Sequence, residues 1–110
     1  MSESLTERDF EIAADAELHE LERALGEVDG VEVDLESGIL TLEFSSGDAY
    51  VVNSHRAARQ IWMAADRTAW HFDYQPAERK WVATKSGDEL WSALSKVLGA
   101  KLGRPVTLGK

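Results

Sequence analysis

The chain of 110 residues contains no cysteine. That absence excludes disulfide bonds, thiolate catalysis and cysteine-ligated zinc or iron–sulfur sites within the chain itself. It also suits a reducing compartment, where disulfides are rare. No apolar run approaches the ~18 residues that a membrane-spanning helix needs. The segment from Met1 to Glu7 lacks the basic and apolar regions of a signal peptide, so we expect a cytoplasmic protein.

Motifs typical of enzymes are also missing. The sequence has no glycine-rich phosphate loop, no G-x-S-x-G elbow and no H-E-x-x-H zinc motif. Its three histidines, His19, His55 and His71, stand apart along the chain. An isolated histidine is more often a surface or packing residue than a ligand, although a triad assembles in space rather than in sequence. We therefore expect no catalytic site.

Basic residues are scarce in the first third of the chain. Residues 1–36 hold 13 acidic side chains against two basic ones, a net charge of −11, whereas residues 37–110 carry +3. A surface this acidic repels nucleic acid and anionic membranes and attracts cations or basic protein patches. A simpler interpretation is that the acids keep a small protein soluble. The uneven distribution favours a binding surface.

What is present indicates one α+β domain over residues 1–110, with enough apolar residues (44%) for one core. Apolar residues recur every three or four positions from Phe10 to Val28, which predicts an N-terminal helix, with Ser4 or Thr6 as its N-cap and Gly26 or Gly30 as stop signals. A second helix is predicted near the C-terminus, with Ser86 and Glu89 at the spacing of a capping box.

Alternating patterns between the helices predict an antiparallel sheet. The predicted strands are 31–36, 40–44, 50–53, 60–65, 70–74 and 81–83, with a loop at 54–59 and a turn at 66–68. The simplest architecture lays both helices on one face of the sheet and leaves the other face in water. In the first strand this arrangement points three acids, Glu32, Asp34 and Glu36, away from the apolar side.

Carboxylates are dense where the first helix leads into the first strand. Glu22, Glu27, Asp29, Glu32 and Asp34 fall in this short stretch. Oxygen donors suit hard cations such as iron, manganese, magnesium or calcium, and a cation relieves their mutual repulsion. Their spacing matches no closed cage, so we expect weak, exposed metal binding, with a merely solvated face as the alternative.

Four tryptophans, Trp62, Trp70, Trp81 and Trp91, form the second notable feature. Most should be core residues, because aromatic side chains carry large apolar area. If Ile61 and Met63 point inward, however, period two turns Gln60 and Trp62 outward. An exposed tryptophan beside an amide is typical of a protein-binding hot spot, whereas burial of Trp62 is the alternative.

Several of these residues together resemble the bacterial frataxin family. The likeness spans nearly the whole chain. It rests on Phe10 with Ala14-Asp15, the hairpin Ser37-Gly38-Ile39-Leu40-Thr41-Leu42, Gln60-Ile61-Trp62, His71-Phe72-Asp73, Trp81, Ser86-Gly87 and Trp91. The resemblance implies two helices on one face of an antiparallel sheet. It also implies a regulatory, non-enzymatic role in iron–sulfur cluster assembly, with weak ferroxidase activity as a minor alternative.

The resemblance further implies a set of site residues and partners. Ferrous and ferric iron would bind weakly along an acidic ridge of Asp15, Glu22, Glu27, Asp29, Glu32 and Asp34. The sheet surface used for partner contact would include Asn53, Gln60 and Trp62. The implied partners are a cysteine desulfurase and an iron–sulfur scaffold protein, bound by a monomer that iron can drive into oligomers. A metal-independent acidic protein-binding module remains the alternative.

Overall fold

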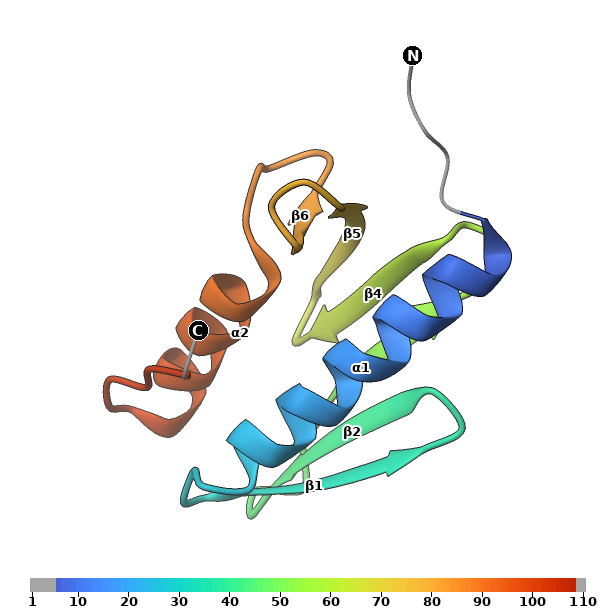
Figure 1. The fold of residues 1–110 in the computed structure, drawn as a ribbon. Helices are drawn as coiled ribbons and strands as arrows, with labels where there is room; N and C mark the ends of the chain where they lie inside the picture. The colour runs from blue at the N-terminus through green and yellow to red at the C-terminus, as the bar shows by residue number, and fades with distance from the viewer. Residues whose placement is uncertain (1–5, 109–110) are drawn as a thin grey trace.

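The computed structural model describes residues 6–108 as two helices and one six-stranded sheet (Figure 1). Every strand pairs antiparallel with its neighbour in the chain, so the sheet is a simple meander. The elements in chain order are α1 (Glu7–Leu25), β1 (Val31–Glu36), β2 (Ile39–Phe44), β3 (Ala49–His55), β4 (Gln60–Ala65), β5 (Thr68–Gln75), β6 (Lys80–Ala83) and α2 (Leu90–Leu102).

Both helices cover the same face of the sheet, as the alternating pattern predicted (Figure 1). The apolar stripe of α1 is buried from Phe10 to Leu25, and α2 buries Leu90, Leu94 and Leu98. The covered, inner face of the sheet supplies Leu40, Leu42, Tyr50, Val52, Ile61, Met63, Phe72 and Trp81. The α+β architecture expected from the sequence is confirmed, and the opposite, outer face carries the polar residues of the strands.

The start of α1 follows from local chemistry. Thr6 is its N-cap, and the Thr6 hydroxyl accepts a hydrogen bond from the Asp9 N–H (3.0 Å). Glu7 and Asp9 stand in the first turn, where the helix dipole favours negative charge. The alternative cap, Ser4, lies outside the described residues. The helix ends at Leu25, and Gly30, with φ +95°, turns the chain into β1.

The predicted capping box of α2 is wrong. Glu89 is itself the N-cap, and its carboxylate accepts hydrogen bonds from the N–H groups of Trp91 (2.9 Å) and Ser92 (3.1 Å). Ser86 is occupied elsewhere, since its hydroxyl bonds the Asp88 carboxylate in the preceding turn. Glu89 also stays extended because it bridges to β6 at Val82. Because Glu89 pairs with β6, the N-cap of α2 lies three residues later than predicted, at Glu89 instead of Ser86.

Strands β3 and β5 exceed the predicted strands most, while β2 and β6 each begin one residue earlier than predicted. Ser54 and His55 belong to β3 rather than to a loop, because they pair with Ile61 and Gln60 of β4. Thr68 likewise starts β5 opposite Ala65 instead of completing a turn. Pairing with a neighbouring strand extended both elements beyond their alternating segments. The longer β3 places His55 on the outer face beside β4.

Glu17 of α1 is a buried charged residue. Its side chain is buried between the two helices, where its carboxylate accepts a hydrogen bond from the Trp91 indole. A buried carboxylate needs such a partner. Trp81 also lies in the core, with its ring 6.0 Å from Phe10 and 4.8 Å from Tyr74. The expectation that most tryptophans are core residues is therefore wrong, since Trp81 and Trp91 are buried while Trp62 and Trp70 are half-buried.

Candidate functional site

The six predicted metal ligands spread along one border of the molecule, where α1 packs over β1. Asp15 and Glu22 lie on α1, Glu27 and Asp29 lie in the α1–β1 connection, and Glu32 and Asp34 lie on the outer face of β1. All are exposed except Glu22, which is half-buried.

Register adds a seventh acid to this border that the sequence pattern did not single out. Glu43 of β2 is the direct cross-strand partner of Glu32. Side chains at such positions have Cβ atoms about 5 Å apart, and like charges placed there destabilise a sheet. Asp29, Glu32 and Glu43 also line one hollow of about 470 Å³ beside the α1–β1 connection. We call the seven residues Asp15, Glu22, Glu27, Asp29, Glu32, Asp34 and Glu43 the acidic edge.

Basic side chains neutralise the start of α1 more than the acidic edge. Arg56 lies 2.6 Å from Glu11 and 3.4 Å from Glu7. Asp15 faces His19, whose Nδ1 lies 3.5 Å from the Asp15 carboxylate. Within residues 6–108, no ion pair or hydrogen bond involves the side chains of Glu22, Glu27, Glu32, Asp34 or Glu43. The uncompensated negative charge therefore gathers at the far end of α1 and along β1 and β2.

A residue near the C-terminus holds the α1–β1 connection, which carries Glu27 and Asp29, by a hydrogen bond. The Arg104 guanidinium, just beyond α2, donates a hydrogen bond to the Asp29 backbone carbonyl (2.5 Å). This contact uses the main chain and leaves the Asp29 carboxylate exposed. Among the described residues, no group of three or more histidine, aspartate or glutamate side chains is arranged to hold one metal ion. An ion at the acidic edge would share one or two carboxylates and complete its shell with water.

The predicted partner-contact residues Asn53, Gln60 and Trp62 share the outer face at its centre. One cross-strand row runs from Glu36 of β1 through Ile39, Asn53 and Trp62 to His71 of β5. The next row places His55, Gln60 and Asp73 side by side. Ile39 is 48% exposed, which is unusual for a large apolar side chain on this fold. The acids of β1 and the predicted contact residues thus lie on one continuous surface.

Trp62 points outward with Gln60, as period two predicted, while Ile61 and Met63 are buried. Its indole is nevertheless covered on both faces. The His55 ring stacks at a centroid distance of 3.7 Å and the His71 ring at 4.3 Å, each inclined by 15°. The three rings, which we call the ring ladder, come from β3, β4 and β5. Two histidines that stand apart in sequence therefore meet at one tryptophan.

Hydrogen bonds hold the edge of the same indole. Trp62 Nε1 donates to Gln60 Oε1 (2.8 Å), and Gln60 Nε2 donates to Asp73 Oδ1 (3.0 Å). Glu43, His55, His71 and Asp73 are the residues that sequence reasoning missed as members of either surface. The alternation His71-Phe72-Asp73 signalled that two of them share a face, but no sequence signal gave their neighbours.

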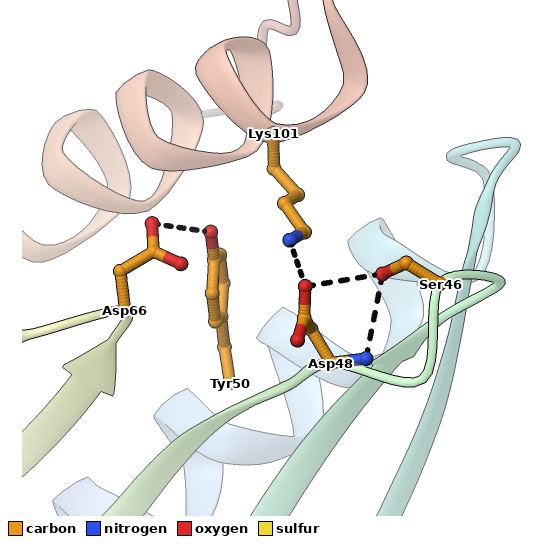
Figure 2. Close-up of polar contacts among 5 residues, drawn as sticks. All are labelled: Ser46, Asp48, Tyr50, Asp66 and Lys101. Atoms are coloured by element: carbon orange, nitrogen blue, oxygen red, sulfur yellow. Dashed lines mark hydrogen bonds and ion pairs between the residues drawn. The ribbon is translucent and has the colours of Figure 1, made fainter.

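The resolved pKa shifts lie away from both surfaces, in a cluster that joins α2 to the sheet (Figure 2). Lys101 of α2 donates a hydrogen bond to Asp48 in the β2–β3 turn, and this contact lowers the pKa of Asp48 and raises the pKa of Lys101. Beside it, burial and a hydrogen bond to Asp66 (2.9 Å) raise the pKa of Tyr50 to about 12. Structural ion pairs perturb pKa values as catalytic sites do, and this cluster fastens α2 to the sheet.

Comparison with known proteins gives a consistent result. A family model described as a frataxin-like domain matches residues 3–104. The chain is 38% identical to a protein named iron-sulfur cluster assembly protein CyaY from Ralstonia nicotianae, over 94% of this chain and 95% of the relative. It is 32% identical to a protein of the same name from Thioalkalivibrio sulfidiphilus, covering 90% and 95%.

A solved structure of frataxin from Psychromonas ingrahamii superposes with a TM-score of 0.86 at 26% identity, covering 96% of this chain and 99% of that one. Two helices on a six-stranded antiparallel sheet are thus the architecture of both. Within residues 6–108, no helix is both long and apolar enough to cross a membrane.

Proposed function

The chain belongs to the frataxin family, and from this premise we propose that it takes part in iron–sulfur cluster assembly as an iron-binding regulator. In this role it binds ferrous or ferric iron weakly and acts as an adaptor of a cysteine desulfurase and its scaffold protein. The relatives' shared name, iron-sulfur cluster assembly protein, supports the general role. That name describes an assembly protein, so we propose a non-enzymatic function in the bacterial cytoplasm.

One observation carries the proposal: the strand register places the acids of β1 and β2 and the predicted partner-contact residues on a single outer face. Glu36, Ile39, Asn53 and Trp62 form one unbroken row to the ring ladder, and Glu36 lies on the same face of β1 as Asp34 of the acidic edge. A partner that covers Trp62 therefore also reaches the carboxylates that attract cations. Iron held there would sit at the rim of the docked complex.

The acidic edge suits weak iron binding. Carboxylate oxygens are ligands that iron accepts, and the opposed pair Glu32 and Glu43 gains most from a cation because it relieves their repulsion. Asp29, beside the same hollow, is the nearest further donor. Because each ion is shared between one or two exposed carboxylates and water, affinity should be low and adaptable. Iron is cargo or signal here, not a buried resident cofactor.

The same exposed charges suit docking to a basic protein patch. Charges spread along a rim steer association and set its salt dependence more than they set affinity. Asn53, Gln60 and Trp62 would supply the central contact, because tryptophan is enriched in hot spots. We propose a monomer as the docking unit, with oligomers forming when iron bridges acidic edges of different copies.

Cluster assembly kinetics with purified desulfurase and scaffold test this proposal. The rate should change when the protein is added, and the size of the change should depend on ferrous iron concentration. Reversal of Glu22, Asp29 and Glu32 to lysine should weaken the effect, whereas Glu78→Lys, an exposed acid in the β5–β6 loop, serves as the matched control. No effect at any iron concentration would refute the role.

A metal-independent acidic module is the second candidate, favoured by the lack of three converging ligands within the described residues. It predicts that desulfurase affinity is the same in a chelator as in ferrous iron. The two candidates are separated by a ferrous titration followed by chemical shifts. Iron-dependent function requires shifts that cluster on residues 15–34 and on Glu43.

A further inference from the structure

Trp62 is a surface tryptophan without a free face. Imidazole rings from two other strands lie parallel to both sides of its indole, at centroid distances of 3.7 Å for His55 and 4.3 Å for His71. A partner therefore cannot stack on the indole without displacing a histidine. What the outer face presents at this point is the edge of three stacked rings.

The indole is also fixed within its own plane. Its N–H donates to Gln60 Oε1, and the Gln60 amide is oriented in turn by its hydrogen bond to Asp73. Rings on two faces oppose rotation out of the plane, and the hydrogen bond opposes rotation within it. Four side chains from three strands thus hold one half-buried tryptophan in a single orientation.

Holding a contact residue in place before binding has a thermodynamic consequence. A rotamer-rich side chain that becomes ordered in an interface loses entropy, and a side chain that is already ordered avoids this loss. We propose that His55 and His71 are positioning residues that clamp Trp62, so that the sheet offers its partner a rigid ladder of ring edges. This inference rests on the proposed docking role of Trp62.

The two histidines contribute differently. His55 Nδ1 accepts a hydrogen bond from the Ala58 N–H (3.3 Å), so this side chain also anchors the β3–β4 loop. For His71, ring stacking on Trp62 is the side-chain contact that the described residues provide. A phenylalanine keeps the flat ring and loses the nitrogens. His71→Phe should therefore preserve the clamp, whereas His55→Phe loses the loop contact as well.

The clamp is tested first in the free protein. The Trp62 indole N–H is observed in ¹⁵N–¹H spectra, assigned by its loss in Trp62→Phe. In His55→Ala/His71→Ala this signal should shift, because ring currents disappear, and its hydrogen exchange should accelerate. His71→Phe should retain slow exchange. If the double alanine variant leaves the signal unchanged, the histidines do not hold the indole and the proposal is wrong.

Docking is tested second, as affinity for the purified desulfurase–scaffold complex in a chelator. The double alanine variant should bind about fivefold to tenfold more weakly. His71→Phe should bind within twofold of wild type, and so should the control Lys96→Ala, an exposed residue of α2. Thermal unfolding confirms that each variant is folded, and the single variant His71→Ala replaces the double one if that fails to fold.

The outcomes separate this inference from the function on which it rests. A shifted, faster-exchanging Trp62 indole signal together with weaker docking, both restored in His71→Phe, supports the positioning role. The same change in the indole signal with unchanged docking overturns it, because ordering of Trp62 then contributes nothing to binding. If the wild-type protein does not bind the complex at all while the signal responds as expected, the proposed function fails and the clamp of Trp62 by its two histidines stands.

Discussion

Along the acidic edge, the carboxylates of Glu32, Asp34 and Glu43 project into solvent, whereas a few strands away Trp62 is held on both faces and along one edge. The two regions share one sheet face but differ in how tightly their side chains are ordered. Exposed charges act additively and over distance, so no single carboxylate should dominate. An interlocked cluster behaves as a unit, so loss of one member should be severe.

Removal of the Trp62 indole, the middle ring of the ring ladder, should have the largest effect on docking. Trp62→Ala should weaken docking to the desulfurase–scaffold complex by about 30-fold or more, since hot-spot truncations cost about 2 kcal/mol or more. Equilibrium binding in a chelator measures it, with thermal unfolding as a check on folding. A loss below threefold would mean that the ring ladder is not part of the interface.

Charge reversal probes the other region. The combined variant Glu22→Lys/Asp29→Lys/Glu32→Lys should weaken docking about tenfold, with each single change contributing about twofold, because separated sites add. The loss should appear mainly in the association rate and should shrink at high salt, where exposed charges are screened. Stopped-flow binding at two ionic strengths measures this, with Glu78→Lys as control. If one single variant causes the whole loss, the acids form a dedicated site instead.

Within the acidic edge, the repulsion between Glu32 and Glu43 can be tested separately. Glu43→Gln removes one of two like charges that face each other across β1 and β2, so stability should rise by about 0.2–1 kcal/mol. Ferrous affinity should fall in the same variant. Urea denaturation and an iron titration measure the two effects.

Glu36→Gln is the matched control, because its cross-strand partner is Ile39 rather than an acid. It should leave stability nearly unchanged. A Glu43→Gln variant that is less stable than wild type would show that repulsion between the two glutamates is not a cost in the folded protein.

The contact of α2 with the sheet should make its own contribution to the pH dependence of stability. Because the Asp48 pKa is lowered in the folded state, its contribution is present above its ordinary pKa of 3.8 and is lost as pH falls through the folded value. Asp48→Asn should therefore destabilise the protein at pH 7 and match wild type at low pH. Denaturation midpoints at both pH values decide this, and an equal deficit at both would contradict it.

Tyr50 and Lys101, whose pKa values are raised rather than lowered, affect stability at high pH instead. The raised pKa of Tyr50, about 12, means that its contribution is complete below pH 10 and is lost as pH rises toward 12. The raised Lys101 pKa acts in the same direction above pH 10.5. Tyr50→Phe should flatten the decline in stability over this interval. A decline as steep as in wild type would assign it to other groups.

Local patterns in the sequence were enough for much of the fold and for the elements on which the candidate site residues lie. Apolar spacing predicted α1, alternation predicted the strands and their outward acids, and inward Ile61 and Met63 implied outward Trp62. These features depend on helical or strand periodicity, which each segment carries by itself. The predicted ligands are therefore on the expected elements.

Features that depend on pairing between elements were not predictable in this way. Glu89 caps α2 because its backbone bridges to Val82, and Glu17 is buried because Trp91 of the other helix reaches it. Periodicity says which face a side chain occupies but not what lies opposite. The predicted capping box failed for that reason, and the burial of Glu17 was not predicted.

The sequence by itself determined that the protein carries an acidic first third and no cysteine, but it did not decide between an outward and a buried Trp62. The tertiary structure alone decided that Glu43 faces Glu32, that one row links Glu36 to Trp62, and that two distant histidines enclose that indole. The physical reason is register. Cross-strand hydrogen bonding aligns residues that are up to 14 positions apart in neighbouring strands, as for Ile39 and Asn53. Two such pairings in succession bring His55 of β3 and His71 of β5 to either side of Trp62, and no local pattern encodes that alignment.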